Sequence, residues 1–106
     1  MGEYQSFTEL AVWKKARLLK NEIQELVSTF PKEEKYRLTD QLIRSSRSIN
    51  NNIAEGHGRF TYKDQLHFYI QARGALSETY NHLVDSFDFG YIKEDQLSTS
   101  NVKLMR

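Results

Sequence analysis

The amino-acid sequence predicts an all-α protein, an antiparallel up-down four-helix bundle whose fourth helix is short or incomplete. Three segments place apolar residues at alternating spacings of four and three, so these residues share one face of a helix. The single proline and most of the five glycines lie at the boundaries of these segments. The connections between them are short, so neighbouring helices should be antiparallel. A chain of 106 residues is the size of one domain, residues 1–106.

The first two helices are expected over residues 8–30 and 33–55. Pro31 ends the first helix, because the residue before a proline is steered away from helical angles. Gly56 and Gly58 are expected to stop the second helix at a sharp turn. The apolar stripe of the first helix is Val12, Ala16, Leu19, Ile23, Leu26 and Phe30, and that of the second is Leu38, Leu42, Ser46, Ile49 and Ile53.

The third helix is expected over residues 61–88. Thr61 followed by Asp64 resembles a capping box, and Gly90 is placed to cap the C-terminus. The stripe of this helix is Leu66, Tyr69, Arg73, Leu76, Tyr80, Leu83 and Phe87. A fourth helix over residues 94–106 is supported only by Leu97, Leu104 and Met105. It looks too short to cover the other three helices, so an exposed apolar groove, and with it self-association, is expected.

Composition restricts the classes of function. The chain has 39% hydrophobic and 27% charged residues, as an ordinary globular protein does. It has no cysteine, which excludes disulfides and thiolate chemistry. No apolar run reaches the ~20 residues that a membrane span needs, and the N-terminus does not resemble a signal peptide. The net charge of +1 means that nucleic-acid binding would need clustered charge.

Arginines gather on the second helix and its exit. Arg44 and Arg47 are one turn apart, Asn51 follows one turn later, and Arg59 lies just beyond the glycines. Residues at these spacings share a helix face, and the arginine fork suits both carboxylate and phosphate. Three interpretations remain open for this face: a solvated surface, a subunit interface, or a contact with RNA or DNA.

A second group of polar residues points to a buried charge network or an oligomer interface. Arg73 occupies a position in the apolar stripe, where an unpaired charge would be costly, so Glu55 or Glu78 is its expected partner, either within the subunit or across a subunit interface. Gly74 in mid-helix costs about 1 kcal/mol relative to alanine, and close approach of another helix would explain it. Asn52 completes the group.

Catalytic and metal-binding motifs are missing from the sequence. Asp64 with His67, and Glu78 with His82, lie at helical spacing and could each share a metal, but a di-iron bundle needs two Glu-x-x-His pairs, and the sequence has none. No arginine precedes a histidine at the spacing of helical ribonucleases. Ser45, Ser46 and Ser48 have no histidine nearby in sequence, and no glycine loop resembles a P-loop. We therefore expect no catalytic residue, no metal and no cofactor.

The sequence resembles the four-helix-bundle proteins encoded within 23S rRNA intervening sequences of bacteria. The central signature is Asn52 to Gly56 with Gly58-Arg59, between two amphipathic helices. The resemblance covers about residues 7–92. It also includes Phe7 to Ala16, Phe30-Pro31, Leu38, Gln41-Leu42, Arg44, Ser48-Ile49, Phe68, Ala72, Gly74, Glu78 and Gly90-Tyr91-Ile92.

This resemblance implies a cytoplasmic bundle that assembles into a ring, typically a homopentamer. A related branch serves as the accessory protein of diversity-generating retroelements and resembles a partner of reverse transcriptase and nucleic acid. Family members usually carry a longer fourth helix. From the residues and the resemblance together, we expect a non-enzymatic oligomer that binds RNA or DNA, or a protein that handles them, through Arg44, Arg47 and Arg59. The alternative is a protein-interaction scaffold whose arginines only build the oligomer.

Overall fold

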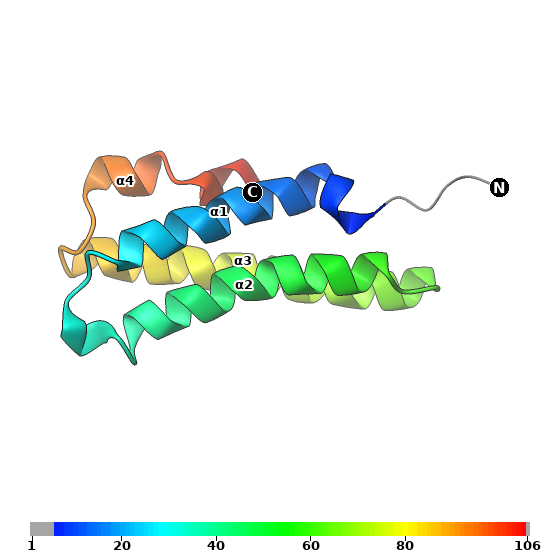
Figure 1. Cartoon of the computed structure of the whole chain (residues 1–106), viewed down its shortest axis with the longest axis horizontal. Coiled ribbons are helices and arrows are strands. Elements are labelled where there is room, and N and C mark those ends of the chain that lie inside the picture. The colour runs from blue at the N-terminus through cyan, green and yellow to red at the C-terminus, as the bar shows by residue number, and fades with distance from the viewer. Residues whose placement is uncertain (1–5, 106) are drawn as a thin grey trace.

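The computed structural model describes residues 6–105 and shows an all-helical bundle of four α-helices with no strand in that range. The helices are α1 (Ala11–Val27), α2 (Leu38–His57), α3 (Tyr62–Asp88) and α4 (Glu94–Ser98). Successive long helices run in opposite directions, and the molecule is elongated, with extents of 52 × 22 × 19 Å (Figure 1). The predicted fold class is confirmed. Three short 3₁₀ helices accompany the α-helices: η1 (Phe7–Glu9), η2 (Lys32–Glu34) and η3 (Asn101–Met105).

Hydroxyl side chains shorten the first and fourth helices relative to the prediction. α1 ends at Val27, three residues before the expected end, where the hydroxyls of Ser28 and Thr29 donate to the carbonyls of Glu25 and Leu26. Such bonds offer the backbone an alternative to the next helical turn. The expected helix over 94–106 divides in the same way, because Ser98 and Thr99 both donate to the carbonyl of Asp95.

The start of the second helix also differs from the prediction. Residues 33–37 are not part of an α-helix, and α2 begins at Leu38. Arg37 has φ −121° and ψ −108°, outside the helical region, and its side chain makes no capping hydrogen bond. The end is also later than expected, because α2 continues through Gly56 to His57.

Two caps that the sequence predicts fix the ends of α3. The Thr61 hydroxyl accepts a hydrogen bond from the Asp64 backbone N–H at 3.1 Å. At the other end Gly90 has φ +78°, and the N–H groups of Gly90 and Tyr91 donate to the carbonyls of Phe87 and Ser86. This is the Schellman arrangement, which satisfies two carbonyls that the helix leaves open. Ile92 then turns into the core and is buried.

Small residues bring α2 and α3 together along their length. Ser45, Ala72, Ala75 and Thr79 are buried, and the Thr79 hydroxyl donates to the Ser45 hydroxyl at 2.8 Å inside this contact. Short side chains allow helix axes to approach closely. The α2–α3 pair is consequently the most extensive helix contact of the molecule.

The C-terminal segment is held on α1 by one carboxylate. Glu22 Oε1 accepts a hydrogen bond from the Ser100 hydroxyl at 2.5 Å. Glu22 Oε2 accepts from the backbone N–H and the side-chain amide of Asn101, at 3.1 and 2.8 Å. These bonds satisfy the polar groups at the break between α4 and η3, and η3 lies against α1 (Figure 1). Val102 is fully buried there.

The predicted apolar stripe of the third helix is covered over only part of its length. Leu76 and Leu83 are buried, whereas Leu66 and Tyr69 are exposed. Val12 on α1 is exposed as well. α1 contacts α2, but α1 and α3 scarcely meet. The stripes of α1 and α3 are therefore left partly uncovered at the end of the bundle where α1 begins, in line with the exposed apolar groove that the sequence predicts.

Candidate partner-binding groove

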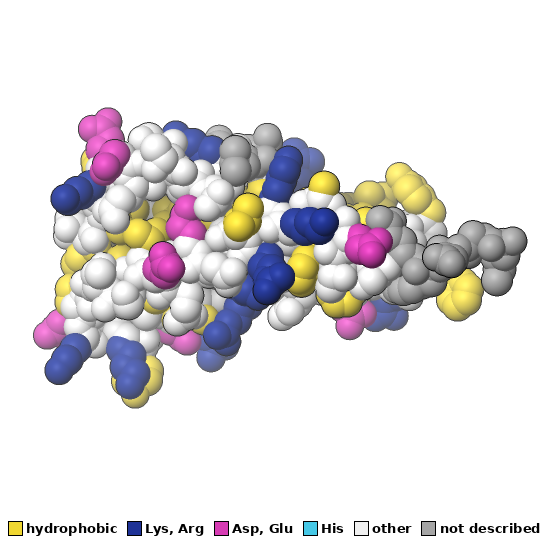
Figure 2. Space-filling model, turned by 45° about the horizontal axis from the view of Figure 1, so that its top comes forward, with side chains coloured by type: hydrophobic (Ala, Val, Ile, Leu, Met, Phe, Trp, Pro, Cys, Tyr) yellow, Lys and Arg dark blue, Asp and Glu magenta, His cyan; other side chains and the backbone are white. Residues whose placement is uncertain are grey.

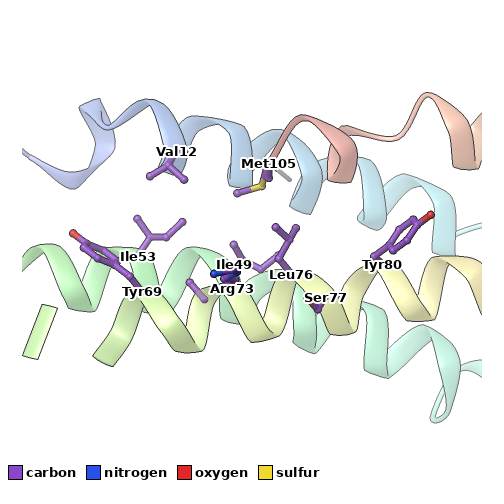
Figure 3. A pocket seen from close by; sticks show the side chains of 10 residues that line it. Val12, Ile49, Ile53, Tyr69, Arg73, Leu76, Ser77, Tyr80 and Met105 are labelled. Atoms are coloured by element: carbon purple, nitrogen blue, oxygen red, sulfur yellow. The ribbon is translucent and has the colours of Figure 1, made fainter. Parts of the chain in front are cut away.

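A groove of about 680 Å³ opens between α1 and α3. Its floor is Ile49 and Ile53 of α2, and Val12 of α1 stands at its rim. Figure 3 shows Val12 and Met105 on one side and the α3 residues on the other. The α3 side is formed by Tyr69, Ala72, Arg73, Leu76, Ser77 and Tyr80. The groove that the sequence predicts, where the fourth helix covers too little of the bundle, is present.

Among the described residues that line this groove, Arg73 is the only charged one. The predicted pairing with Glu55 or Glu78 is not formed within the chain. Both glutamates lie on other faces and are engaged elsewhere: Glu55 pairs with Arg59 at 3.0 Å and Glu78 with His82 at 3.0 Å. Among residues 6–105, no acidic group forms an ion pair with Arg73. Its side chain is exposed in the single chain, and a pairing across subunits stays a prediction.

Gly74 is not a point of close approach inside the chain. A Cβ built on Gly74 would meet no described atom within 4 Å, so no helix of the same chain lies against it. Gly56 takes that role instead. A Cβ there would lie 2.9 Å from Tyr69 Cε1 and 3.1 Å from Phe68 Cβ. Gly56 therefore lets α3 approach the end of α2, and its φ is not positive, so it does not stop the helix as predicted.

The predicted arginine stripe on α2 is present as an exposed face, but carboxylates occupy much of it. Arg44 Nε donates to Asp40 at 2.9 Å. Arg59 pairs with Glu55, and its guanidinium also lies 4.6 Å from the centre of the Phe68 ring. Arg47 is the one member of the three with no acidic partner among the described residues. The stripe thus carries less available positive charge than the sequence suggests.

The Asn52 side chain makes hydrogen bonds along α2, whereas Gly56 and Arg59 of the segment from Asn52 to Arg59 contact α3. The Asn52 amide donates to the Ser48 carbonyl at 2.9 Å and to the Ser48 hydroxyl at 3.1 Å, so it belongs to no charge network. Asn51, Glu55 and Arg59 border a shallow hollow on the outer surface. Within one chain, then, Asn52, Glu55, Arg73, Gly74 and Glu78 do not form the network that the sequence predicts.

A stronger basic face lies on α1, where the sequence analysis did not place one. Lys14, Lys15 and Arg17 are exposed, Lys20 is partly exposed, and no acidic residue occurs from Ala11 to Asn21. The Arg17 guanidinium lies 5.8 Å from the centre of the Trp13 ring. Figure 2 shows Lys and Arg side chains gathered on the face of the molecule that includes α1. The acid-free run of cations could have been noticed in the sequence.

An apolar ridge borders the groove on the outer side of α3. Tyr62, Leu66 and Ile70 follow one another at four-residue spacing, and Gly74 is next in the same row. Leu66 is 43% and Ile70 60% exposed. We call these four residues the α3 ridge.

The described residues offer no metal site and no candidate for a membrane crossing. In residues 6–105 no three His, Asp or Glu side chains are grouped so that they could bind a metal ion. Over the same range, no helix combines the length and the apolar character that a bilayer crossing requires. His67 contacts Gln71 and His82 contacts Glu78, each one turn away on the same helix.

Comparison with known proteins agrees with the signature around Asn52 to Arg59. None of the curated proteins compared with the chain matches it. A family model described as 23S rRNA-intervening sequence protein matches residues 8–105. The match covers nearly the whole chain and extends past residue 92, so it includes α4 and η3. The chain therefore belongs to the 23S rRNA-intervening sequence protein family.

Proposed function

We propose that this protein is a non-enzymatic helical scaffold that acts as a homo-oligomer. The observation that carries the proposal is the α3 ridge, a row of exposed apolar side chains on a regular helix. A contiguous row of exposed apolar side chains usually marks a surface that binds another protein. The ring of five chains and the cytoplasmic location that the family resemblance implies belong to the same proposal.

Gly74 gives the α3 ridge a geometry that suits assembly. The open space above its Cα would let the helix of a neighbouring subunit approach the backbone, while Leu66 and Ile70 supply apolar area beside it. An apolar side chain contributes about 1.5–3 kcal/mol when it is fully buried. Repeated at each interface of a ring, this small surface would support a stable assembly.

Light scattering coupled to size exclusion tests the proposal. At micromolar concentration the wild-type chain should have the mass of an oligomer. Ile70→Glu places a charge in the ridge and should release monomers with unchanged helical circular dichroism. Gln24→Glu is the matched control, because it adds the same charge on the exposed side of α1. A wild-type monomer, or an oligomer that Ile70→Glu leaves intact, would disprove assembly through the ridge.

RNA or DNA binding is the second candidate function. The basic face of α1 and the unpaired Arg47 support it, whereas the carboxylates beside Arg44 and Arg59 weaken the surface first expected. Binding through phosphates releases counterions, so it should fall steeply between ~50 and ~200 mM salt. In fluorescence anisotropy with a labelled single-stranded RNA, Lys14→Gln with Arg17→Gln should weaken binding more than Arg44→Gln with Arg47→Gln. No binding at low salt by an intact oligomer would leave the scaffold alone.

A further inference from the structure

The groove between α1 and α3 is long enough to bind about three turns of a helix. Its α3 side runs from Tyr69 to Tyr80, which is about three turns or roughly 17 Å of helix. The lining residues of α3 occur at spacings of three and four, the pattern of a helix–helix contact. Ala72 and Ser77 are small, so the backbone of a docked helix can come close between the larger side chains.

The lining is apolar apart from one cation. Val12 and Tyr69 provide exposed hydrophobic surface that a partner's apolar stripe can cover, and the buried Ile49, Ile53 and Leu76 form the base of the groove. Grooves of this type bind amphipathic helices through anchors at i, i+3 or i+4, and i+7. Stacking of nucleic-acid bases, by contrast, needs accessible aromatic faces along a basic track, and this lining has aromatic rings only at its two ends.

The charges around the groove specify the charge of the partner. Arg73 lies in the middle of the groove without an acidic partner among the described residues (Figure 3). Lys15 is one helical turn from Val12, so it lies on the same side of α1, and Lys103 is exposed on η3, the element that supplies Met105. The part of the lining that lies in residues 6–105 contains no Asp or Glu.

We propose that this groove binds an amphipathic helix of another protein, with carboxylates flanking its apolar stripe. A second copy of the chain is a poorer match, because its own exposed apolar row, the α3 ridge, is flanked by Lys63 and His67 as well as Asp64. The partner helix would place one carboxylate against Arg73 and another toward Lys15. This inference rests on the proposed scaffold function and names the partner that the scaffold would hold.

Two synthetic peptides provide the probe. Both are 18-residue helices with leucines at heptad positions, and they differ only in flanking residues, glutamate in one and lysine in the other. In fluorescence anisotropy the glutamate peptide should bind the full wild-type chain about tenfold more tightly than the lysine peptide, as one well-formed ion pair implies. Equal affinity for the two peptides, or no binding of either, would overturn the proposal.

Charge reversal at Arg73 locates the binding. Arg73→Glu should invert the preference, so that the lysine peptide binds more tightly than the glutamate peptide. Arg47→Glu is the matched control, because it makes the same change on the outer face of α2 and should leave the preference unaltered. Arg73→Glu is an exposed change, and helical circular dichroism checks that the fold is kept. A preference that survives in Arg73→Glu would refute the groove as the site.

Assembly and peptide binding can be separated in the same samples. Ile70→Lys, which places a charge in the ridge without adding a carboxylate one turn from Arg73, should dissociate the oligomer and still bind the glutamate peptide, whereas Arg73→Glu should lose that peptide and remain oligomeric. If wild type is a monomer yet binds the glutamate peptide selectively, the scaffold's self-assembly fails and the groove proposal stands. If Arg73→Glu dissociates the oligomer and wild type binds no peptide, a second copy occupies the groove and the groove proposal is wrong.

Discussion

The two sides of α3 differ in how completely the chain covers them. Toward α2, small buried residues and the Ser45–Thr79 hydrogen bond close the contact from one end to the other. Toward α1, the helices scarcely meet and a groove remains. Both sides belong to one continuous helix with one heptad-like stripe. The comparison teaches that a periodic apolar pattern marks a contact surface without stating whether the contact lies inside the chain.

The difference follows from which elements lie beside α3. On the open side, η3 contributes Met105 to the groove, and α1 scarcely meets α3. α2 by contrast packs against α3 as far as Gly56, where a Cβ would meet the Phe68 and Tyr69 side chains. The side of α3 that faces α2 therefore belongs to a complete core. The side that faces the groove also carries apolar residues, but no helix within residues 6–105 packs over them.

The largest expected effect separates two leucines of α3. Leu83→Ala removes a fully buried side chain and should lower the free energy of unfolding by about 2–5 kcal/mol. Leu66→Ala, the matched substitution on the open side, should change it by at most about 0.5 kcal/mol in the unassembled chain. Urea unfolding followed by circular dichroism at low protein concentration measures both. A cost for Leu66→Ala close to that for Leu83→Ala would show that Leu66 is covered after all.

Much of the fold could be predicted from the sequence, because local signals determine it. The Thr61 cap, the Gly90 cap and the three long helices depend on residues within a few positions of one another. The roles of Gly56 and Gly74 could not be predicted, since they depend on which helix passes near each glycine. The sequence analysis placed the close approach at Gly74, and the structure places it at Gly56.

The site was predicted less well than the fold. The expected groove is present, but among the described residues Arg73 pairs with neither Glu55 nor Glu78, and a pairing across subunits stays a prediction. Glu55 has Arg59, and Glu78 has His82, four residues further along the chain, and such near neighbours compete with any residue of another helix. The same one-turn rule pairs Arg44 with Asp40, so it could have been applied to all three carboxylates in advance.

Alanine substitutions at the two helical glycines should change the free energy of unfolding by an intermediate amount and in opposite directions. Gly56→Ala forces a Cβ against Phe68 Cβ and Tyr69, and overpacking of this kind costs about 1–3 kcal/mol, offset in part by the ~1 kcal/mol that alanine gains over glycine in a helix. Gly74→Ala has open space and should raise the stability of the unassembled chain by about 0.5–1 kcal/mol. Thermal unfolding at low protein concentration shows whether each substitution raises or lowers the stability.

Measurements at higher protein concentration test whether Gly74 also takes part in assembly. If subunits meet at Gly74, Gly74→Ala should weaken assembly at higher concentration even while it stabilises the monomer. Sedimentation velocity over a concentration series follows this directly. If Gly74→Ala assembles as tightly as wild type, Gly74 is not part of the proposed interface. If Gly56→Ala is more stable than wild type, α3 does not approach α2 closely at Gly56.

The smallest effect concerns the end of α3 that the chain does cover. The Tyr91 hydroxyl donates to Glu34 at 2.9 Å, and this hydrogen bond, with burial and the negative charge of Glu34, raises the pKa of Tyr91 above its ordinary value of 10.0. A raised folded-state pKa contributes stability that is complete below pH 10 and is lost as the pH rises through the folded-state pKa.

Glu34→Gln isolates that contribution. The substitution removes the carboxylate charge, so the pKa of Tyr91 should fall toward 10.0. The free energy of unfolding of the variant should then decrease less than that of wild type as the pH rises above 10. NMR titration of the Tyr91 ring carbon measures the midpoint in each protein. An unchanged midpoint would mean that Glu34 does not hold the hydroxyl.

The tight approach at Gly56 also bears on the order in which the chain folds. α2 and α3 are joined by only residues 58–61, so closing this hairpin loses little chain entropy and its contacts are local. The contact between Glu22 and Ser100, by contrast, spans 78 positions. We expect the α2–α3 hairpin to form in the folding transition state and the C-terminal segment to join afterwards. Ala75→Gly should then slow folding, and Ser100→Ala should mainly speed unfolding; the reverse pattern in stopped-flow kinetics would contradict this order.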